Sequence, residues 1–140
     1  MDDVFIIKPT KEDIKSAYDV FEVSIRDAFE KEGLGDLKED ILAEIENKSN
    51  LFSYSLDNKD LDVFFLVAKL DERVIGTISF GPCGTDIKKC TNHELDAIGE
   101  LGSLYVLPHY QGHGVGSILI HAMIKYLHEL GIEQFCLDSG

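Results

Sequence analysis

The residues with the clearest chemical meaning form a glycine-rich turn between two apolar segments. Three glycines stand within five positions, at Gly112, Gly114 and Gly116. The segment Glu100–Leu107 before them predicts a strand, and the apolar spacing over about 114–130 predicts a helix. The first backbone N–H groups of a helix have no partner within it, and the helix dipole adds partial positive charge there. Because glycine has no Cβ, an oxyanion can approach those groups closely. The turn therefore predicts a site for a diphosphate.

Other phosphate-binding loops fit this spacing less well. A Walker loop needs a lysine followed by Ser or Thr after its last glycine, but Gly116 is followed by Ser117 and Ile118. The dinucleotide fingerprint needs the spacing G-x-G-x-x-G and a parallel βαβ start, although Glu133 stands near the position of its acidic residue. A purely structural interpretation also stays open, in which the glycines only let the helix pack closely against the strand.

The elements around the turn predict a mixed α/β sheet with helices, in the order β-α-α-β-β-β-α-β. Thr10, with Asp13 three residues later, predicts the N-terminal cap of the first helix. A long loop over 81–98 separates the third and fourth strands. A polar, turn-rich segment over 47–61 follows the second helix, which we expect to be short. The predicted strands are 4–8, 62–70, 74–80, 100–107 and 134–138, and the helices are about 11–32, 37–46 and 114–130.

Composition sets the broad class of protein. The chain has 140 residues, of which 44% are apolar, so we expect a single domain over 1–140. No segment approaches the roughly 20 apolar residues of a membrane span, and the acidic start does not resemble a signal peptide, which predicts a cytoplasmic protein with no membrane partner. The net charge is −13, and residues 1–62 carry 17 acidic and 8 basic residues. This charge repels nucleic acids, and it either favours a cationic ligand or only forms solvated helix faces that aid solubility.

The cysteines predict neither a disulfide framework nor a metal site. Cys83, Cys90 and Cys136 are an odd number at uneven spacing, which is typical of free thiols. The first two, with His93, give the spacing C-x6-C-x2-H. That pattern lacks a fourth ligand and matches no usual zinc site. Cys136 stands in an apolar segment and is expected to fill the core.

The segment Gln111-Gly112-His113-Gly114-Val115-Gly116 matches the signature Q/R-x-x-G-x-G/A, and here the sequence resembles the GNAT superfamily of N-acetyltransferases. The order of elements over 1–138 is similar as well. The resemblance implies a mostly antiparallel central sheet flanked by helices. It also implies transfer of an acetyl group from acetyl-CoA to a primary amine, by direct attack on the thioester. The alternatives are a module that binds CoA without turnover and a P-loop-like nucleotide binder.

The resemblance also implies which residues bind the coenzyme. The open strand edge at Leu104, Tyr105 and Val106 pairs with the pantetheine arm, because the strand splays from its neighbour, often at a bulge. A backbone N–H near Val106 or Leu107 stabilises the oxyanion. The diphosphate is held by the backbone of the turn, which comprises Gln111, Gly112, His113, Gly114, Val115, Gly116 and Ser117.

Attack on a thioester needs a neutral amine, so it needs a general base. Glu100 is the candidate catalytic base, because it opens the strand that leads to the turn and some GNAT members carry a catalytic glutamate at the matching place. Glu94, His93 and His109 are reserve candidates, and an exposed structural role is open for each of the four. The acceptor is predicted to be a small-molecule amine or a protein amino group, such as a polyamine, an aminoglycoside or a lysine side chain.

The chain departs from the family pattern at its end. GNAT proteins normally continue with a further helix and two strands, whereas this sequence stops at Asp138-Ser139-Gly140. Those later elements often supply a tyrosine that protonates the leaving thiolate. The resemblance therefore implies a chain that lacks its last helix and strands. The last predicted strand is then an uncovered edge, which favours a homodimer.

Overall fold

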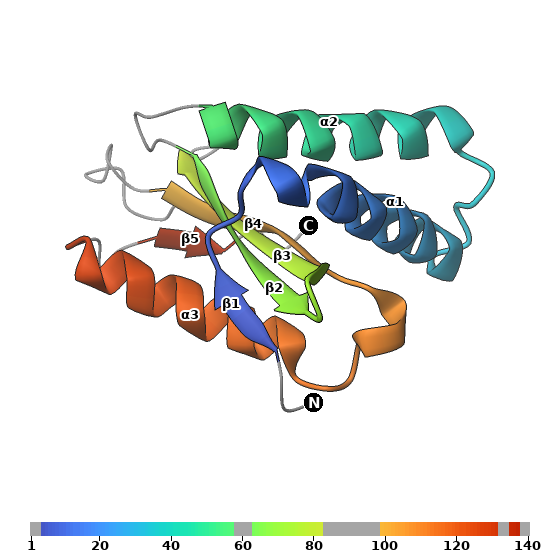
Figure 1. Cartoon of the computed structure of the whole chain (residues 1–140). Coiled ribbons are helices and arrows are strands. Elements are labelled where there is room, and N and C mark those ends of the chain that lie inside the picture. The colour runs from blue at the N-terminus through green and yellow to red at the C-terminus, as the bar shows by residue number, and fades with distance from the viewer. Residues whose placement is uncertain (1–3, 58–62, 83–98, 132–134, 138–140) are drawn as a thin grey trace.

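A five-stranded sheet forms the centre of the computed structural model, which describes residues 4–57, 63–82, 99–131 and 135–137 (Figure 1). The strand order is β1-β2-β3-β4-β5, and every neighbouring pair is antiparallel except β4 and β5, which are parallel. This arrangement confirms the predicted mixed, mostly antiparallel sheet. The strands are β1 Phe5–Ile7, β2 Phe64–Leu70, β3 Arg73–Pro82, β4 Gly99–Val106 and β5 Phe135–Leu137.

Three α-helices cover the sheet. Helices α1 and α2 lie on one face, and α3 lies on the other, where it connects β4 to β5 (Figure 1). The helices are α1 Ile14–Lys31, α2 Lys38–Asp57 and α3 Val115–Glu129, with short 3-10 helices η1 Lys11–Asp13 and η3 Pro108–Tyr110. The predicted order of elements is confirmed. Within the residues described, no helix combines the length and apolarity needed to cross a bilayer.

Helix α2 is much longer than the sequence predicted. We expected a short helix and a turn-rich segment over 47–61, but α2 continues without a break to Asp57. The reason is Phe52, which extends the helical spacing of Ile41 and Ile45 and is only 1% exposed. Its ring packs edge-on against Phe65 of the sheet, with centroids 5.0 Å apart. Burial of this aromatic ring outweighs the turn-forming tendency of the polar residues around it.

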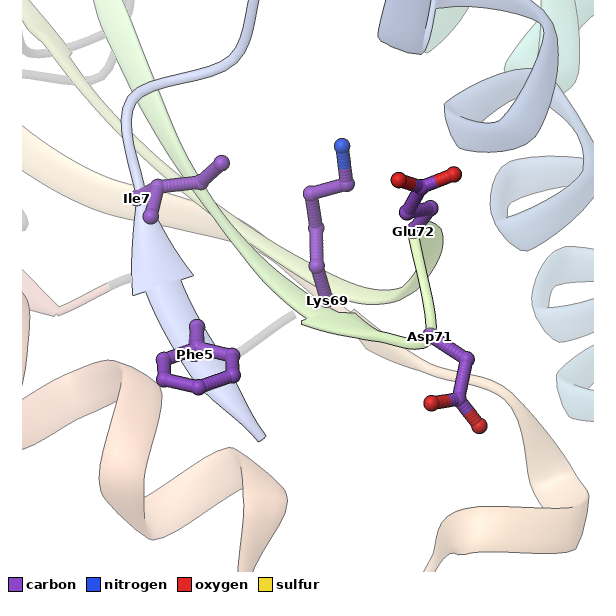
Figure 2. A pocket seen from close by; sticks show the side chains of 5 residues that line it. All are labelled: Phe5, Ile7, Lys69, Asp71 and Glu72. Atoms are coloured by element: carbon purple, nitrogen blue, oxygen red, sulfur yellow. The ribbon is translucent and has the colours of Figure 1, made fainter. Parts of the chain in front are cut away.

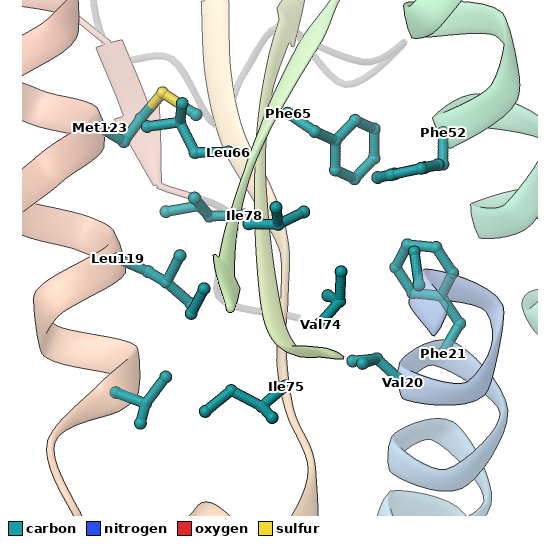
Figure 3. Close-up of a cluster of buried hydrophobic side chains, with 14 of the residues drawn as sticks. Val20, Phe21, Phe52, Phe65, Leu66, Val74, Ile75, Ile78, Leu119 and Met123 are labelled. Carbon is teal, nitrogen blue, oxygen red and sulfur yellow. The ribbon is translucent and has the colours of Figure 1, made fainter. Parts of the chain in front are cut away.

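The core is divided by the sheet into two layers (Figure 3). On the α1 and α2 side, Phe65 meets Phe21 and Phe52 edge-to-face. On the other side, the α3 residues Leu119 and Met123 face the sheet (Figure 3). All five side chains are at most 2% exposed, so solvent is excluded from both faces of the sheet where these residues pack. The positions of the helices relative to the strands therefore follow from packing on both sides.

An ion pair fixes the start of α1 to the sheet. The Thr10 N–H donates to the Asp13 carboxylate at 2.8 Å, which confirms the predicted cap, and Lys69 Nζ on β2 donates to the same carboxylate at 2.8 Å. Asp13 is only 3% exposed. Burial alone would raise the pKa of Asp13, but the hydrogen bonds from Lys69 and Thr10 outweigh it and hold the pKa below its ordinary value of 3.8.

The β2–β3 hairpin is closed by two residues in the left-handed region. Leu70 pairs with Arg73, so the loop contains only Asp71 and Glu72, whose φ angles are +52° and +68°. This is the geometry of a type I′ turn, which Asn-Gly fits better than Asp-Glu. The hairpin therefore carries backbone strain at Glu72 that a glycine would relieve.

The ion pair predicts a pH-dependent loss of stability in Asp13→Asn. At neutral pH we expect the free energy of unfolding to fall by about 2 kcal/mol, because Lys69 loses a charged partner in a buried place. The folded pKa is depressed, so this contribution is present above 3.8 and is lost as the pH falls through the folded pKa. Urea unfolding of both proteins, from neutral pH down to below pH 3.8, measures this contribution to the free energy of unfolding. Asp57→Asn is the control, since its pair with Lys11 is exposed; equal losses in the two variants would contradict the assignment.

The hairpin strain predicts that the double variant Asp71→Asn, Glu72→Gly is more stable than the wild type. We expect a gain of about 0.5–1 kcal/mol in the free energy of unfolding, because relief of the left-handed conformation exceeds the entropy that glycine adds to the unfolded chain. Chemical denaturation measures the gain. Glu46→Gly, an exposed position inside α2, should instead lose about 1 kcal/mol. A loss in the hairpin variant would refute the strain.

Candidate functional site

Between two of its pairs with β3, strand β4 contains one residue more than β3 does. Thr77 of β3 lies opposite Tyr105, but Ser79 lies opposite Gly102, so the register shifts between the two pairs. The extra residue is at Ser103, whose φ is +48°. The Thr77 hydroxyl donates to the Ser103 carbonyl at 2.8 Å in a buried position. This is a β-bulge, as the family resemblance implied. A bulge bends its strand locally.

Beyond the bulge, one edge of β4 is open. Strand β5 pairs with β4 only over Gly99–Leu101, and no other described strand pairs with that edge. The Leu107 N–H donates to the Ile75 carbonyl of β3 at 2.9 Å. Backbone groups of successive residues in a strand alternate between its two edges, so those of Val106 point away from β3. The open edge therefore presents the N–H and C=O groups of Val106.

The carbonyl of Val106 already has two donors. Ser24 Oγ on α1 and Gln111 Nε2 in the turn each lie 3.1 Å from this oxygen. The N–H of Val106 lies on the same edge of the strand. Sequence analysis left Val106 and Leu107 open as oxyanion donors, and the Leu107 N–H is bonded within the sheet.

The glycine turn lies directly beside this edge. Gly112 and Gly114 have φ angles of +84° and +83°, which only glycine adopts without strain. A Cβ at either position would meet nothing within 4 Å, whereas a Cβ at Gly116 would lie 4.0 Å from a methyl group of Val106. The turn thus has open space at Gly112 and Gly114 and meets the side chain of Val106 at Gly116.

The start of α3 supplies the free donors. The first helical hydrogen bond runs from the Ile118 N–H to the Gly114 carbonyl at 3.0 Å, so the N–H groups of Val115, Gly116 and Ser117 precede the helical ladder. Val115 is only 2% exposed, so it offers its backbone alone. The side chains of Gln111, His113 and Ser117 are exposed. The arrangement can hold an anionic group against backbone donors.

The remaining predicted strand-edge residues have different positions. The backbone of Tyr105 faces β3, opposite Thr77, and its ring packs edge-on against Phe21 with centroids 5.8 Å apart. Leu104 is 41% exposed beside the bulge. Of the three residues expected at the edge, Val106 is the one whose backbone groups the hydrogen bonds place there.

Glu100 lies on β4, on the other side of the bulge from Val106. Its Cα is opposite Gly81 on β3 and Cys136 on β5. The structure describes the backbone of Glu100 but not its side chain. The reserve candidates His93 and Glu94 and the metal candidates Cys83 and Cys90 lie outside the described residues.

Histidine and metal ligands add little to the described site. His109 is exposed on η3, where its ring meets Tyr110 edge-on at 5.2 Å. Among the residues that the structure describes, no three His, Cys, Asp or Glu side chains come together as metal ligands.

A second recess lies at the other edge of the sheet, beside β1 (Figure 2). Its apolar part is formed by Phe5 and Ile7, and its rim by Lys69, Asp71 and Glu72. The ammonium group of Lys69 is paired with Asp13, so the rim offers carboxylates and no free cation within its described lining. An anionic ligand would be repelled here.

Sequence reasoning missed two polar residues of the site. Ser24 is 82 positions from Val106 in the sequence, and Thr77 is 26 positions from Ser103. Both side chains lie in segments whose periodicity indicates only helix and strand. A buried serine on the apolar face of a predicted helix was the available signal for the first of them.

Solved structures with the same fold are acetyltransferases. The PaiA N-acetyltransferase of Thermoplasma acidophilum, in complex with coenzyme A, is 24% identical and has a TM-score of 0.69 over 92% of this chain and 74% of that one. A predicted acetyltransferase of Clostridium acetobutylicum with acetyl-CoA is 17% identical, with a TM-score of 0.60 over 98% and 81%. AAC(6')-Iy with a CoA-acetylneamine bisubstrate analogue is 17% identical, with a TM-score of 0.63 over 98% and 80%. No curated protein matches.

The sequence carries the family assignment directly. Residues 20–138 match the acetyltransferase (GNAT) family, and this range contains the bulged strand, the glycine turn and α3. The resemblance seen in the signature Gln111–Gly116 and the observed fold agree with this match. The chain therefore belongs to the GNAT family of acetyltransferases, and it is an acyltransferase.

Proposed function

We propose that the protein transfers the acetyl group of acetyl-CoA to a primary amine by direct attack on the thioester. The observation that carries this proposal is the open edge of β4 beside the glycine turn, where Gly116 adjoins Val106. Acetyl-CoA is the cosubstrate that the family implies. Structural neighbours crystallised with CoA or acetyl-CoA support it.

Two sets of backbone groups bind different parts of the coenzyme. The free N–H groups from Gly112 to Ser117, at the positive end of α3, bind the diphosphate. The open edge of β4 pairs with the pantetheine arm, whose amides add to the sheet as a short strand would. The thioester then reaches the bulge, next to the N–H of Val106.

Acetyl transfer at this point is a balanced exchange. The amine nitrogen attacks the thioester carbon, its proton passes to Glu100 directly or through water, and the N–C bond forms. The oxyanion is stabilised by the Val106 N–H, and the C–S bond then breaks and the thiolate takes up a proton. Glu100 is proposed as the base because it occupies the same strand as the oxyanion donor, across the bulge.

The acceptor is proposed to be a cationic amine. Residues 1–62 carry a net charge of −9, and this part of the chain includes α1 and α2. An acidic surface raises the local concentration of a protonated amine and speeds its association. The acceptor panel should therefore contain spermidine, kanamycin and a lysine peptide, with a neutral alcohol as control.

Release of free thiol from acetyl-CoA, with each acceptor in turn, tests the function. Thiol release with one of the amines and none with the alcohol supports acetyl transfer. Binding of acetyl-CoA without thiol release would instead identify a non-catalytic CoA-binding module. Tighter binding of ATP than of CoA would identify a nucleotide binder.

Glu100→Gln should lower kcat by about 100-fold, because the amide cannot accept the proton of the amine. The acidic limb of the pH profile of kcat should disappear with it. Steady-state kinetics over a range of pH measures both effects, and the KM of acetyl-CoA should hardly change, because the coenzyme is held elsewhere. A wild-type pH profile in the variant would remove Glu100 from the mechanism.

Gly114→Leu should weaken acetyl-CoA binding by about 30-fold or more, since the side chain displaces one or two charge-assisted hydrogen bonds of ~1.5 kcal/mol each. Isothermal titration calorimetry measures the affinity. Gly33→Leu is the matched control, because Gly33 also has a positive φ, +76°, and open space around its Cβ. We expect both variants to fold and only Gly114→Leu to lose affinity. Undiminished affinity would refute the assignment of the turn.

A further inference from the structure

Strand β1 has apolar side chains on both of its faces, but only one face is covered. Ile6 packs against the core on the α3 side, where the ammonium of Lys8 lies 4.5 Å from the centre of the Tyr126 ring. Phe5 and Ile7 point to the opposite face and are 65% and 39% exposed. A solvated strand face ordinarily carries polar residues. Packing among the described residues does not account for this exposed apolar pair.

The exposed pair forms a recess with the tip of the β2–β3 hairpin, and we call it the β1 recess (Figure 2). Phe5 lies opposite Lys69 of β2, so their side chains share one face of the sheet. Lys69 is neutralised by its ion pair with Asp13. Asp71 and Glu72 are exposed, and neither has an ion pair with a described residue. The β1 recess therefore combines apolar surface with negative charge.

The outer edge of β1 is open to a further strand. β1 is the first strand in the sheet and pairs with β2, so no other described strand lies on its far side. The unpaired backbone groups of an edge strand are a template for strand addition. Every second side chain of an added strand would lie on the face of the β1 recess. A small molecule would fill the recess without using this edge, so the arrangement favours a peptide.

Charge decides which peptide fits. Apolar side chains of the added strand would cover Phe5 and Ile7, and a Lys or Arg at its hairpin end would meet the two carboxylates. A second copy of this chain is disfavoured, because two chains of net charge −13 repel one another. Nucleic acids and anionic lipid surfaces are repelled in the same way.

We propose that β1 and the β1 recess dock an extended basic segment of a partner protein. The segment adds to β1 as a strand, places apolar side chains over Phe5 and Ile7, and directs a Lys or Arg to the hairpin carboxylates. Three strand spacings, about 14 Å, separate β1 from β4. This binding is therefore distinct from acetyl transfer and does not depend on it.

The fluorescein-labelled peptide Arg-Thr-Val-Thr-Ile-Thr-Arg tests the proposal. Its Arg, Val and Ile side chains share one face of an extended chain, and the arginine at each end places one beside the hairpin in either strand direction. Fluorescence anisotropy should show binding to the wild type that weakens as salt is added. A peptide with Glu in place of both Arg residues should bind at least about 10-fold more weakly. Equal affinities, or no binding of the Arg peptide, would overturn the proposal.

Two double variants locate the binding site. Phe5→Thr with Ile7→Thr removes the apolar side chains but keeps β-branched residues in the strand, and should weaken peptide binding about 10-fold. Asp71→Asn with Glu72→Gln should weaken it about fivefold, because two solvent-exposed ion pairs are lost. Asn suits the left-handed backbone at position 71, so this hairpin should fold. Wild-type affinity in either variant would contradict the assignment.

Glu39→Gln with Asp40→Asn is the matched control for charge. It removes the same two charges from exposed positions at the start of α2. Affinity for the peptide should change by less than about twofold, because the Debye length at physiological salt is about 8 Å. An equal loss in this control and in the hairpin variant would show that net charge alone attracts the peptide, and would refute the site.

Backbone N-methylation tests the addition of a strand. In an added strand the N–H groups of alternate residues face β1, so methyl groups on Val and Ile and methyl groups on the two Thr residues that follow them should have unequal effects. One pair should abolish binding and the other should be tolerated. Equal effects would contradict strand addition. A wild-type dimer that dissociates in Phe5→Thr with Ile7→Thr, measured by sedimentation, would assign the recess to a second copy and overturn the proposal.

Discussion

One extra residue in β4 is the constraint on which the site depends. A regular strand would keep its backbone groups paired with β3 and β5 along its whole length. The bulge at Ser103 breaks the register and separates β4 into a paired half, Gly99–Leu101, and a half with one open edge. The local disruption leaves carbonyl groups that need donors, and Thr77 and Ser24 supply them from β3 and α1. The open edge is thus stabilised by side chains on either side of it.

The position of the glycine turn depends on how closely α3 approaches the sheet. A Cβ at Gly76 would lie 3.0 Å from a methyl group of Leu119 and 3.3 Å from the Tyr105 carbonyl oxygen. Only a residue without a side chain leaves room there for both the helix and β4. Since the start of α3 and the end of β4 are joined by a short turn, this close packing also brings Gly116 against Val106. A packing contact on β3 therefore contributes to the geometry of the site.

The parts of the structure that local chemistry controls could be predicted from the sequence. The cap at Thr10 and the glycine turn depend on neighbours within a few positions, and the strands follow from their apolar runs. The end of α2 could not be predicted, because Phe52 is helical on account of rings that arrive from α1 and β2. The contact of Ser24 with Val106 is invisible for the same reason, since it joins segments that only the complete sheet brings together. Long-range packing decides such features, and periodicity in one sequence does not report it.

The bond from Gln111 to Val106 ties the glycine turn to the strand that precedes it. The side chain must leave the turn, reach back five residues and present an N–H to a carbonyl oxygen. Amide and guanidinium groups both offer such a donor at the end of a long side chain. A carboxylate of equal length would set oxygen against oxygen, and a shorter amide would stop before the strand. Reach and hydrogen-bond polarity, rather than charge, are therefore what this contact requires of the side chain.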